Sequence, residues 1–130
     1  MTRTTLATLA LTGGLVVASA DAVVAQEAAA IDRGKTVFEH YCTPCHGTGR
    51  GDDGAPMLPG TYALSLKYRG TKPALLEQRV DLPARAIKVF VRRGVASMPP
   101  LRKTEVTDED IEAIAIYLAD ASKKEVNPRR

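Results

Sequence analysis

The chain contains few of the side chains that usually fill a protein core. It has no tryptophan, and its 130 residues include only two phenylalanines and four tyrosines. Ordering a chain on folding costs about 1.5 kcal/mol per residue, and buried apolar side chains normally offset that cost. A domain with so few large side chains is therefore expected to be marginally stable unless another group fills its interior.

Other absences argue against two kinds of partner. The 18 basic and 15 acidic residues leave a formal net charge of only +3, and no helix-like stretch interleaves basic residues with aromatic ones. We therefore expect no nucleic-acid partner. Beyond the N-terminal region, no stretch reaches the roughly 20 apolar residues that a membrane-spanning helix needs. No membrane span is expected in the mature protein.

The N-terminal segment has the pattern of a secretory signal peptide. Arg3 provides a basic start, residues 6–20 carry no charge, and small residues precede Ala25. The uncharged run is too short to span a bilayer, so we predict cleavage after Ala25 and a periplasmic or secreted location. The expected organisation is a signal peptide over residues 1–25, one domain over residues 26–122 and a polar tail over residues 123–130.

The rest of the sequence predicts helices and no β-strands. The clearest helix begins after Thr107, where Ile111, Ile114 and Leu118 recur with helical spacing. A segment rich in glycine and proline, residues 47–60, must either wrap around something or be disordered. Further helical segments are predicted over residues 31–41, 62–68, 73–79 and 83–93. The predicted fold class is all-α.

The segment over residues 83–93 carries both an apolar face and an end signal. Ile87, Phe90 and Val91 lie at i, i+3 and i+4, which predicts that the three share one buried face. Two arginines occupy the last turn and Gly94 follows them. Cations and then glycine are the residues preferred at a helix C-terminus, so we expect the helix to end there.

The only two cysteines belong to a motif with known chemistry. They lie in the run Cys42-Thr43-Pro44-Cys45-His46, which has the C-x-x-C-H spacing of c-type haem attachment. Two thiols separated by one helical turn can add to the vinyl groups on neighbouring rings of a haem. The adjacent histidine then falls under the iron. The motif predicts one covalently bound haem c, with His46 as an iron ligand.

Other chemistries for these residues fit less well. A structural zinc site needs four ligands, whereas the chain has two cysteines and two histidines, and His46 is too close to Cys45 for both to bind one metal comfortably. A thioredoxin-like dithiol is expected in a βαβ context, which the sequence lacks. A disulfide that closes so small a loop would add little stability.

A low-spin haem needs a second axial ligand. Met98 follows the helix that ends near residue 93, and the two prolines after it would stiffen a loop that presents its sulfur. Met57 lies in the glycine-rich segment and is interpreted as an apolar gap-filler. His40 precedes Cys42 on the attachment helix and should point away from the iron. We therefore predict Met98 as the second ligand.

Together these residues resemble the class I, mono-haem c-type cytochromes from Gly34 to Leu118. The resemblance implies a small cytochrome c fold of three to five helices wrapped around one covalently bound haem, with Gly34 and Phe38 packed against Tyr117. It also implies that the Pro56 carbonyl accepts the free imidazole N–H of His46. The matching residues are Gly34, Phe38, Cys42, Cys45, His46, Gly47, Gly54, Ala55, Pro56, Gly94, Met98, Pro99, Pro100, Tyr117 and Leu118.

A finer resemblance concerns residues 64–80, 91–94 and 98–100. They are similar to the small cytochromes that accompany flavin oxidases of the p-cresol methylhydroxylase type. This similarity implies that the chain is the electron-accepting subunit of a flavoprotein dehydrogenase and passes electrons to a downstream acceptor protein.

The predicted function is single-electron transfer without turnover, because two protein ligands leave no open position on the iron. Four cations bracket the Met98 loop and would, as a set, steer an acidic redox partner: Arg92, Arg93, Arg102 and Lys103. Two other functions stay open. A haem that Met98 does not ligate would suit a sensor or a peroxide-reactive protein, and a chain without haem would be a thiol oxidoreductase.

Overall fold

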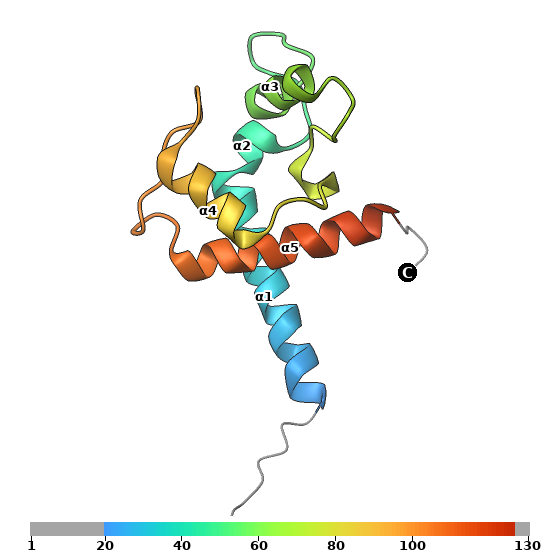
Figure 1. The fold of residues 1–130 in the computed structure, drawn as a ribbon, viewed down its shortest axis with the longest axis vertical. Helices are drawn as coiled ribbons and strands as arrows, with labels where there is room; N and C mark the ends of the chain where they lie inside the picture. The colour runs from blue at the N-terminus through green and yellow to red at the C-terminus, as the bar shows by residue number, and fades with distance from the viewer. Residues whose placement is uncertain (1–19, 127–130) are drawn as a thin grey trace, which may run out of the picture.

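The computed structural model describes residues 20–126 and shows an all-α domain (Figure 1). No strand forms in this part of the chain, and Val95 and Met98 make only an isolated bridge. The predicted fold class is therefore confirmed. The helices are α1 (Ala20–Tyr41), α2 (Thr43–His46), α3 (Pro59–Tyr68), the 3₁₀ helix η1 (Leu76–Gln78), α4 (Ala84–Arg93) and α5 (Asp108–Val126).

The first and last helices cross, as Figure 1 shows. Gly34 lies at the crossing, where a Cβ atom would be 2.5 Å from the carbonyl carbon of Ala113 and 2.9 Å from the Cβ of Tyr117. One turn further along α1, the rings of Phe38 and Tyr117 pack with their centroids 5.5 Å apart. The packing of Gly34 and Phe38 against the Tyr117 turn, which the family resemblance implies, is confirmed.

The buried core lies between α1, α4, α5 and the segment that leads into α5. Its members are Phe38, Ile87, Val91, Val106, Ile111, Ile114, Tyr117 and Leu118. In contrast, residues 43–86 bury only Gly47, Thr61 and Arg79. The segment that contains α2, α3 and η1 therefore has no large buried apolar side chain of its own.

Two helices are longer than the sequence patterns predict. α1 begins at Ala20 instead of residue 31, through an alanine-rich stretch with high helix propensity, and residues 21–29 are exposed. The predicted cleavage point after Ala25 falls within this helix, and most of the predicted signal peptide, residues 1–19, lies outside the described residues. α5 continues to Val126, four residues into the predicted tail, and the ion pair of Lys124 with Asp120 supports this extension.

Two further local predictions need correction. Of the helical segment predicted over residues 73–79, only the 3₁₀ turn Leu76–Gln78 forms, and Pro73 lies outside it. Phe90 does not share the buried face of α4, because 44% of its surface is exposed. Ile87 and Val91, four residues apart, define the face that packs on α5, and Phe90 projects to one side of it.

In the part of the chain that the structure describes, no helix combines the length and the apolar character needed to cross a membrane.

Candidate haem site

The cysteine motif is wound into a single helical turn directly after α1. Cys42 occupies the N-cap position of α2, and its carbonyl accepts hydrogen bonds from the backbone N–H of Cys45 at 3.1 Å and of His46 at 2.8 Å. Residues three apart on a helical turn lie on the same side of it. Both thiols are free, that of Cys42 half-buried and that of Cys45 exposed. The turn therefore presents two thiols in the arrangement that haem attachment requires.

The Cys42 thiol is not activated as a redox nucleophile. Burial, and to a smaller degree the neighbouring Cys45, raise the pKa of Cys42 to about 11. Reactive dithiols show the opposite shift, because the thiolate is the attacking species. The raised pKa of Cys42 argues against the thiol oxidoreductase.

His46 lies half-buried at the end of α2, against the first turn of α3. Burial lowers the pKa of His46, which favours the neutral imidazole that ligates metals. Its Nδ1 atom is buried without a hydrogen-bond partner. A Cβ atom on Gly60 would lie 2.7 Å from Cε1 and 2.8 Å from Nδ1 of the ring. Only glycine at position 60 allows the α3 backbone to approach the imidazole this closely.

A second contact ties the motif to α3. Thr61, which is buried, donates a hydrogen bond of 2.9 Å from its hydroxyl to the carbonyl of Gly47. Neither Gly60 nor Thr61 was among the predicted site residues, and the sequence pattern around Gly60 predicts only a loop. A glycine one position inside a helix that begins at a proline is a signal of close packing that could have been noticed.

Pro56 makes no hydrogen bond to Nδ1 of the imidazole in the described structure. The residue is exposed, and His46 Nδ1 has no hydrogen-bond partner. The loop around Pro56 is held by its own turn, in which Gly51 donates to the Ala55 carbonyl at 3.0 Å. The bond between the Pro56 carbonyl and His46 therefore stays a prediction for the haem-bound protein.

A tight turn after α4 presents Met98. The backbone groups of Val95 and Met98 pair with each other at 3.1 and 2.9 Å. Gly94 and Ala96 both have positive φ angles, +65° and +51°, and a Cβ on Gly94 would lie 2.5 Å from the Met98 carbonyl oxygen. The Met98 side chain is half-buried against the core, whereas Met57 is 37% exposed. Of the two methionines, Met98 is the one that the fold holds in place.

The residues present fit a haem. Two free thiols lie one helical turn apart, beside a neutral imidazole with an unpartnered buried nitrogen. Exposed apolar side chains on a small domain often indicate a ligand or a partner, and a porphyrin could cover several of them. Those outside α1 and α5 are Met57, Tyr62, Leu66, Val80, Val89, Phe90 and Val95. Zinc has no such support, because no three His, Cys, Asp or Glu residues within residues 20–126 cluster as metal ligands would.

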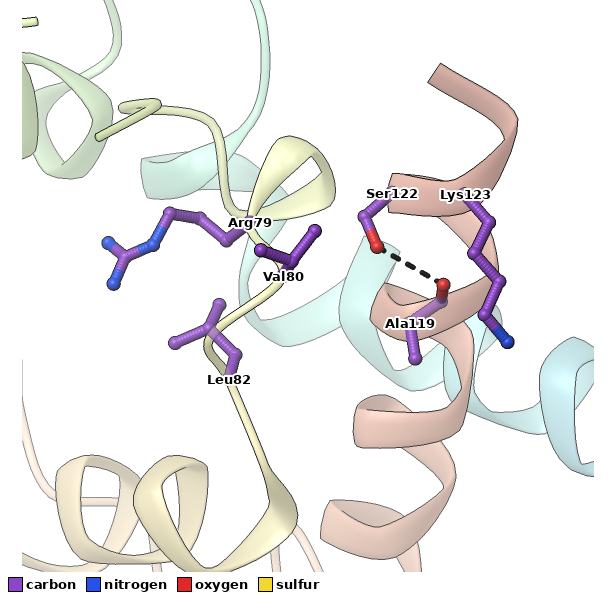
Figure 2. A pocket seen from close by; sticks show the side chains of 6 residues that line it. All are labelled: Arg79, Val80, Leu82, Ala119, Ser122 and Lys123. Carbon is purple, nitrogen blue, oxygen red and sulfur yellow. Dashed lines mark hydrogen bonds between the residues drawn. The ribbon is translucent and has the colours of Figure 1, made fainter. Parts of the chain in front are cut away.

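Two hollows lie elsewhere on the surface and involve neither the cysteine motif nor Met98, although Val80 lines both of them. One, of about 170 Å³, lies between Leu82 and the end of α5 (Figure 2). It is smaller than the roughly 300–1,000 Å³ of typical ligand pockets. In Figure 2 the Arg79 guanidinium points away from Ser122 and Lys123, so the polar groups do not converge. The other hollow, of about 300 Å³, is lined by Thr71, Lys72, Pro73, Gln78, Val80 and Asp81.

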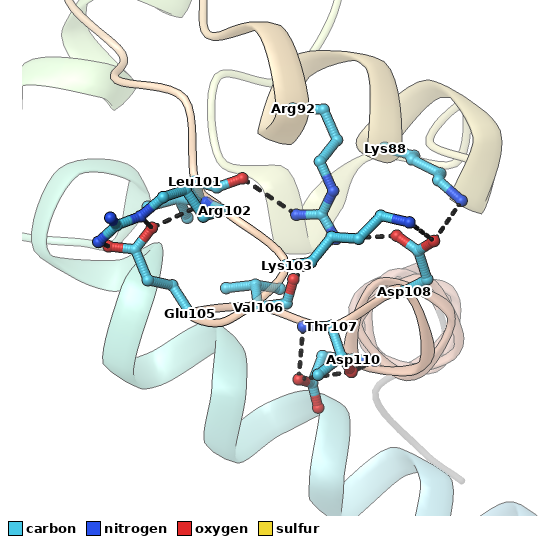
Figure 3. A network of polar contacts seen from close by, with 10 residues as sticks. All are labelled: Lys88, Arg92, Leu101, Arg102, Lys103, Glu105, Val106, Thr107, Asp108 and Asp110. Carbon is cyan, nitrogen blue, oxygen red and sulfur yellow. Dashed lines mark hydrogen bonds and ion pairs between the residues drawn. The ribbon is translucent and has the colours of Figure 1, made fainter.

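Four of the cations near the Met98 loop, Lys88, Arg92, Arg102 and Lys103, are paired with carboxylates (Figure 3). Asp108 accepts from Lys88 at 2.9 Å and from Arg92 at 2.8 Å, and Lys103 lies 3.3 Å away. These partners, Lys88 first, hold the pKa of Asp108 well below its usual range. Arg102 pairs with Glu105 at 3.3 Å.

Arg92 differs from the other cations of this group. Its side chain is 19% exposed, compared with 79% for Arg102 and 73% for Lys103. The prediction that Arg92 belongs to a set of steering charges is therefore wrong, because its guanidinium is turned into the protein by the hydrogen bonds it makes to the backbone.

These features define the class of protein: an all-α domain that presents C-x-x-C-H on one helical turn, with its first and last helices packed through a glycine and two aromatic rings, is a c-type cytochrome domain. The family model described as cytochrome c oxidase, cbb3-type, subunit III matches residues 29–118. Since this match covers well over half of the chain, the protein belongs to that family. It is a haem c protein that transfers electrons to and from redox partners.

No curated protein matches the chain. The finer resemblance, to the cytochromes of p-cresol methylhydroxylase-type enzymes, finds no support in the comparisons.

Proposed function

We propose that the protein is a periplasmic or secreted carrier of single electrons, with one haem c attached to Cys42 and Cys45 and ligated by His46 and Met98. The observation that carries the proposal is the helical turn of α2, which presents both thiols beside a half-buried imidazole. We propose a single haem because the sequence contains only two cysteines, and both belong to this motif.

The haem, His46 and Met98 would each have a different role in such a carrier. The haem, when bound, supplies the redox couple. His46 is held by the backbone at Gly60, which limits rotation of the imidazole. Met98 would provide a thioether, and His/Met ligation raises the haem potential relative to other ligand sets. If His46 and Met98 both held the iron, no position would remain on it for a substrate.

The proposed ligation is tested by Met98→Ala in the haem-containing protein. We expect wild type to be low-spin in both oxidation states and the variant to be high-spin, because alanine leaves one axial position without a protein ligand. Visible spectra of both redox states measure this directly, and the exposed Met57→Ala is the matched control. A wild type that is already high-spin would contradict the proposal and favour the sensor or peroxide-reactive alternative.

We further propose an acidic redox partner that docks near the Met98 loop. Around this loop, four cations pair with only two carboxylates, Asp108 and Glu105, so a positive excess remains after pairing. Arg102 and Lys103 are the most exposed of the paired cations and therefore the best placed to meet a partner. A flavoprotein dehydrogenase as donor and a separate downstream acceptor are the partners that the finer sequence resemblance suggests.

The steering role is tested by Arg102→Glu combined with Lys103→Glu. At low ionic strength we expect oxidation of the reduced protein by the anionic probe ferricyanide to slow about tenfold, with a flatter salt dependence. Stopped-flow absorbance measures the rate. Lys35→Glu, at an exposed lysine on α1, should have a smaller effect. Equal rates for wild type and the double variant at every ionic strength would contradict steering from this surface.

A further inference from the structure

We infer that Arg92 closes the loop that contains Met98 and thereby positions the methionine sulfur on the iron. Arg92 would be a positioning residue, which acts through the loop without touching the haem. The inference rests on the proposed ligation by Met98.

The far end of the loop is bonded back onto the last turn of α4. Leu101, three residues after Met98, donates its backbone N–H to the Val91 carbonyl at 2.8 Å. Its carbonyl accepts a hydrogen bond of 3.1 Å from Nη1 of Arg92. Both backbone groups of Leu101 are thus held by consecutive residues of one helix. Residues 94–100, between these attachments, form a closed loop.

The same guanidinium also ties the loop to the start of α5. Nη2 of Arg92 donates to the Val106 carbonyl at 2.7 Å and to Asp108 at 2.8 Å. Figure 3 shows the guanidinium between Leu101 and Asp108. One side chain therefore fixes three points: the loop end, the segment before α5 and the first residue of α5. A lysine, with one compact ammonium group, cannot reproduce this planar fork of donors.

The position of Arg92 includes one contact that is unfavourable for the free energy of folding. Its Nε atom is buried without a hydrogen-bond partner. An unpartnered donor of a charged, partly buried group is unfavourable. The arrangement is consistent with a side chain whose two terminal nitrogens are committed to fixed backbone positions.

The hydrogen bonds of Arg92 at the end of the loop affect the position of Met98 because the loop backbone has little conformational freedom. Pro99 and Pro100 have restricted φ angles, and the Val95–Met98 turn is held by two backbone hydrogen bonds. A shift of Leu101 therefore moves Met98 with it. An open loop would release the thioether and leave the iron accessible to an external ligand.

The test uses the haem-containing protein with Arg92→Gln, Arg92→Lys and the control Lys88→Gln. Lys88 also bonds Asp108 but makes no hydrogen bond to Leu101. Imidazole is the probe, titrated into the oxidised protein. We expect both Arg92 variants to bind imidazole about tenfold more tightly than wild type, since each loses hydrogen bonds from a charged group. Their methionine-to-ferric-iron charge-transfer band should weaken and their reduction potential should fall.

Three outcomes are decisive. Imidazole affinity and a methionine–iron band equal to those of wild type in both Arg92 variants would overturn the inference. An equal change in Lys88→Gln would also overturn it, because the charge on Asp108 and not the loop closure would then be responsible. If wild type itself lacks the methionine–iron band, the proposed ligation is wrong and the inference falls with it. Should Arg92→Gln fail to fold, Arg92→Lys decides.

Discussion

A variant with Cys42→Ser and Cys45→Ser is expected to lose its haem and, with it, any cooperative thermal transition. The reason is the distribution of buried side chains. Residues 43–86 bury only Gly47, Thr61 and Arg79, so this segment has no apolar core of its own. Ordering this segment costs conformational entropy, and a covalently attached porphyrin would supply apolar burial that these three residues lack.

The loss should not be uniform along the chain. Phe38, Ile111, Ile114 and Leu118 belong to the core between α1, α4 and α5, and the only partly buried apolar side chains of residues 43–86 that pack against this core are Leu76 and Leu82, so partial helicity should persist. Far-UV circular dichroism against temperature would show a low, sloping signal. Limited proteolysis should cut first between residues 43 and 86.

The matched control for this variant is the wild-type chain produced without haem maturation and kept reduced. It should behave like the serine variant, because the missing haem and not the missing thiols causes the loss of structure. A cooperative transition in both haem-free proteins would show that the polypeptide core is sufficient for folding. The haem would then not be required to stabilise the fold.

Helices α4 and α5 could be predicted from the sequence because the residues that signal them are local. α5 has apolar residues with helical spacing, and Thr107 caps it as expected: its hydroxyl accepts from the Asp110 backbone N–H at 3.1 Å. α4 ends at Gly94, whose φ of +65° suits glycine. Capping residues and apolar periodicity involve positions only a few residues apart, so they can be recognised in the sequence without knowledge of the fold.

The contacts that build the site could not be predicted in the same way. Gly60 approaches His46 from fourteen positions away, and Arg92 reaches the Leu101 and Val106 carbonyls. Both residues have ordinary local interpretations, as a loop glycine and as a surface cation at a helix end. Their roles depend on which backbone groups the fold brings to them. Composition and spacing do not encode this. Phe90 was misplaced for a similar reason, since its exposure depends on the direction from which α5 covers α4.

Gly34→Ala is expected to destabilise the haem-containing protein by about 3 kcal/mol, although alanine normally stabilises a helix relative to glycine by up to about 1 kcal/mol. A Cβ atom at position 34 would lie 2.5 Å from the carbonyl carbon of Ala113 and 2.9 Å from the Cβ of Tyr117. Both neighbours are fixed by the α5 backbone, so no side-chain rotation relieves the overlap. The helices must separate, and the Phe38–Tyr117 contact must loosen.

Guanidinium denaturation followed at the haem Soret band and by circular dichroism measures this free energy of unfolding. Thr36→Ala is the control, because it is an exposed position on the same helix and should change stability by less than about 0.5 kcal/mol. Adding Ala113→Gly to Gly34→Ala should not restore stability, since the overlap involves the Ala113 backbone. Wild-type stability in Gly34→Ala would mean that α1 and α5 are not held at this separation, and the crossing would then be a looser support for the haem site than the structure shows.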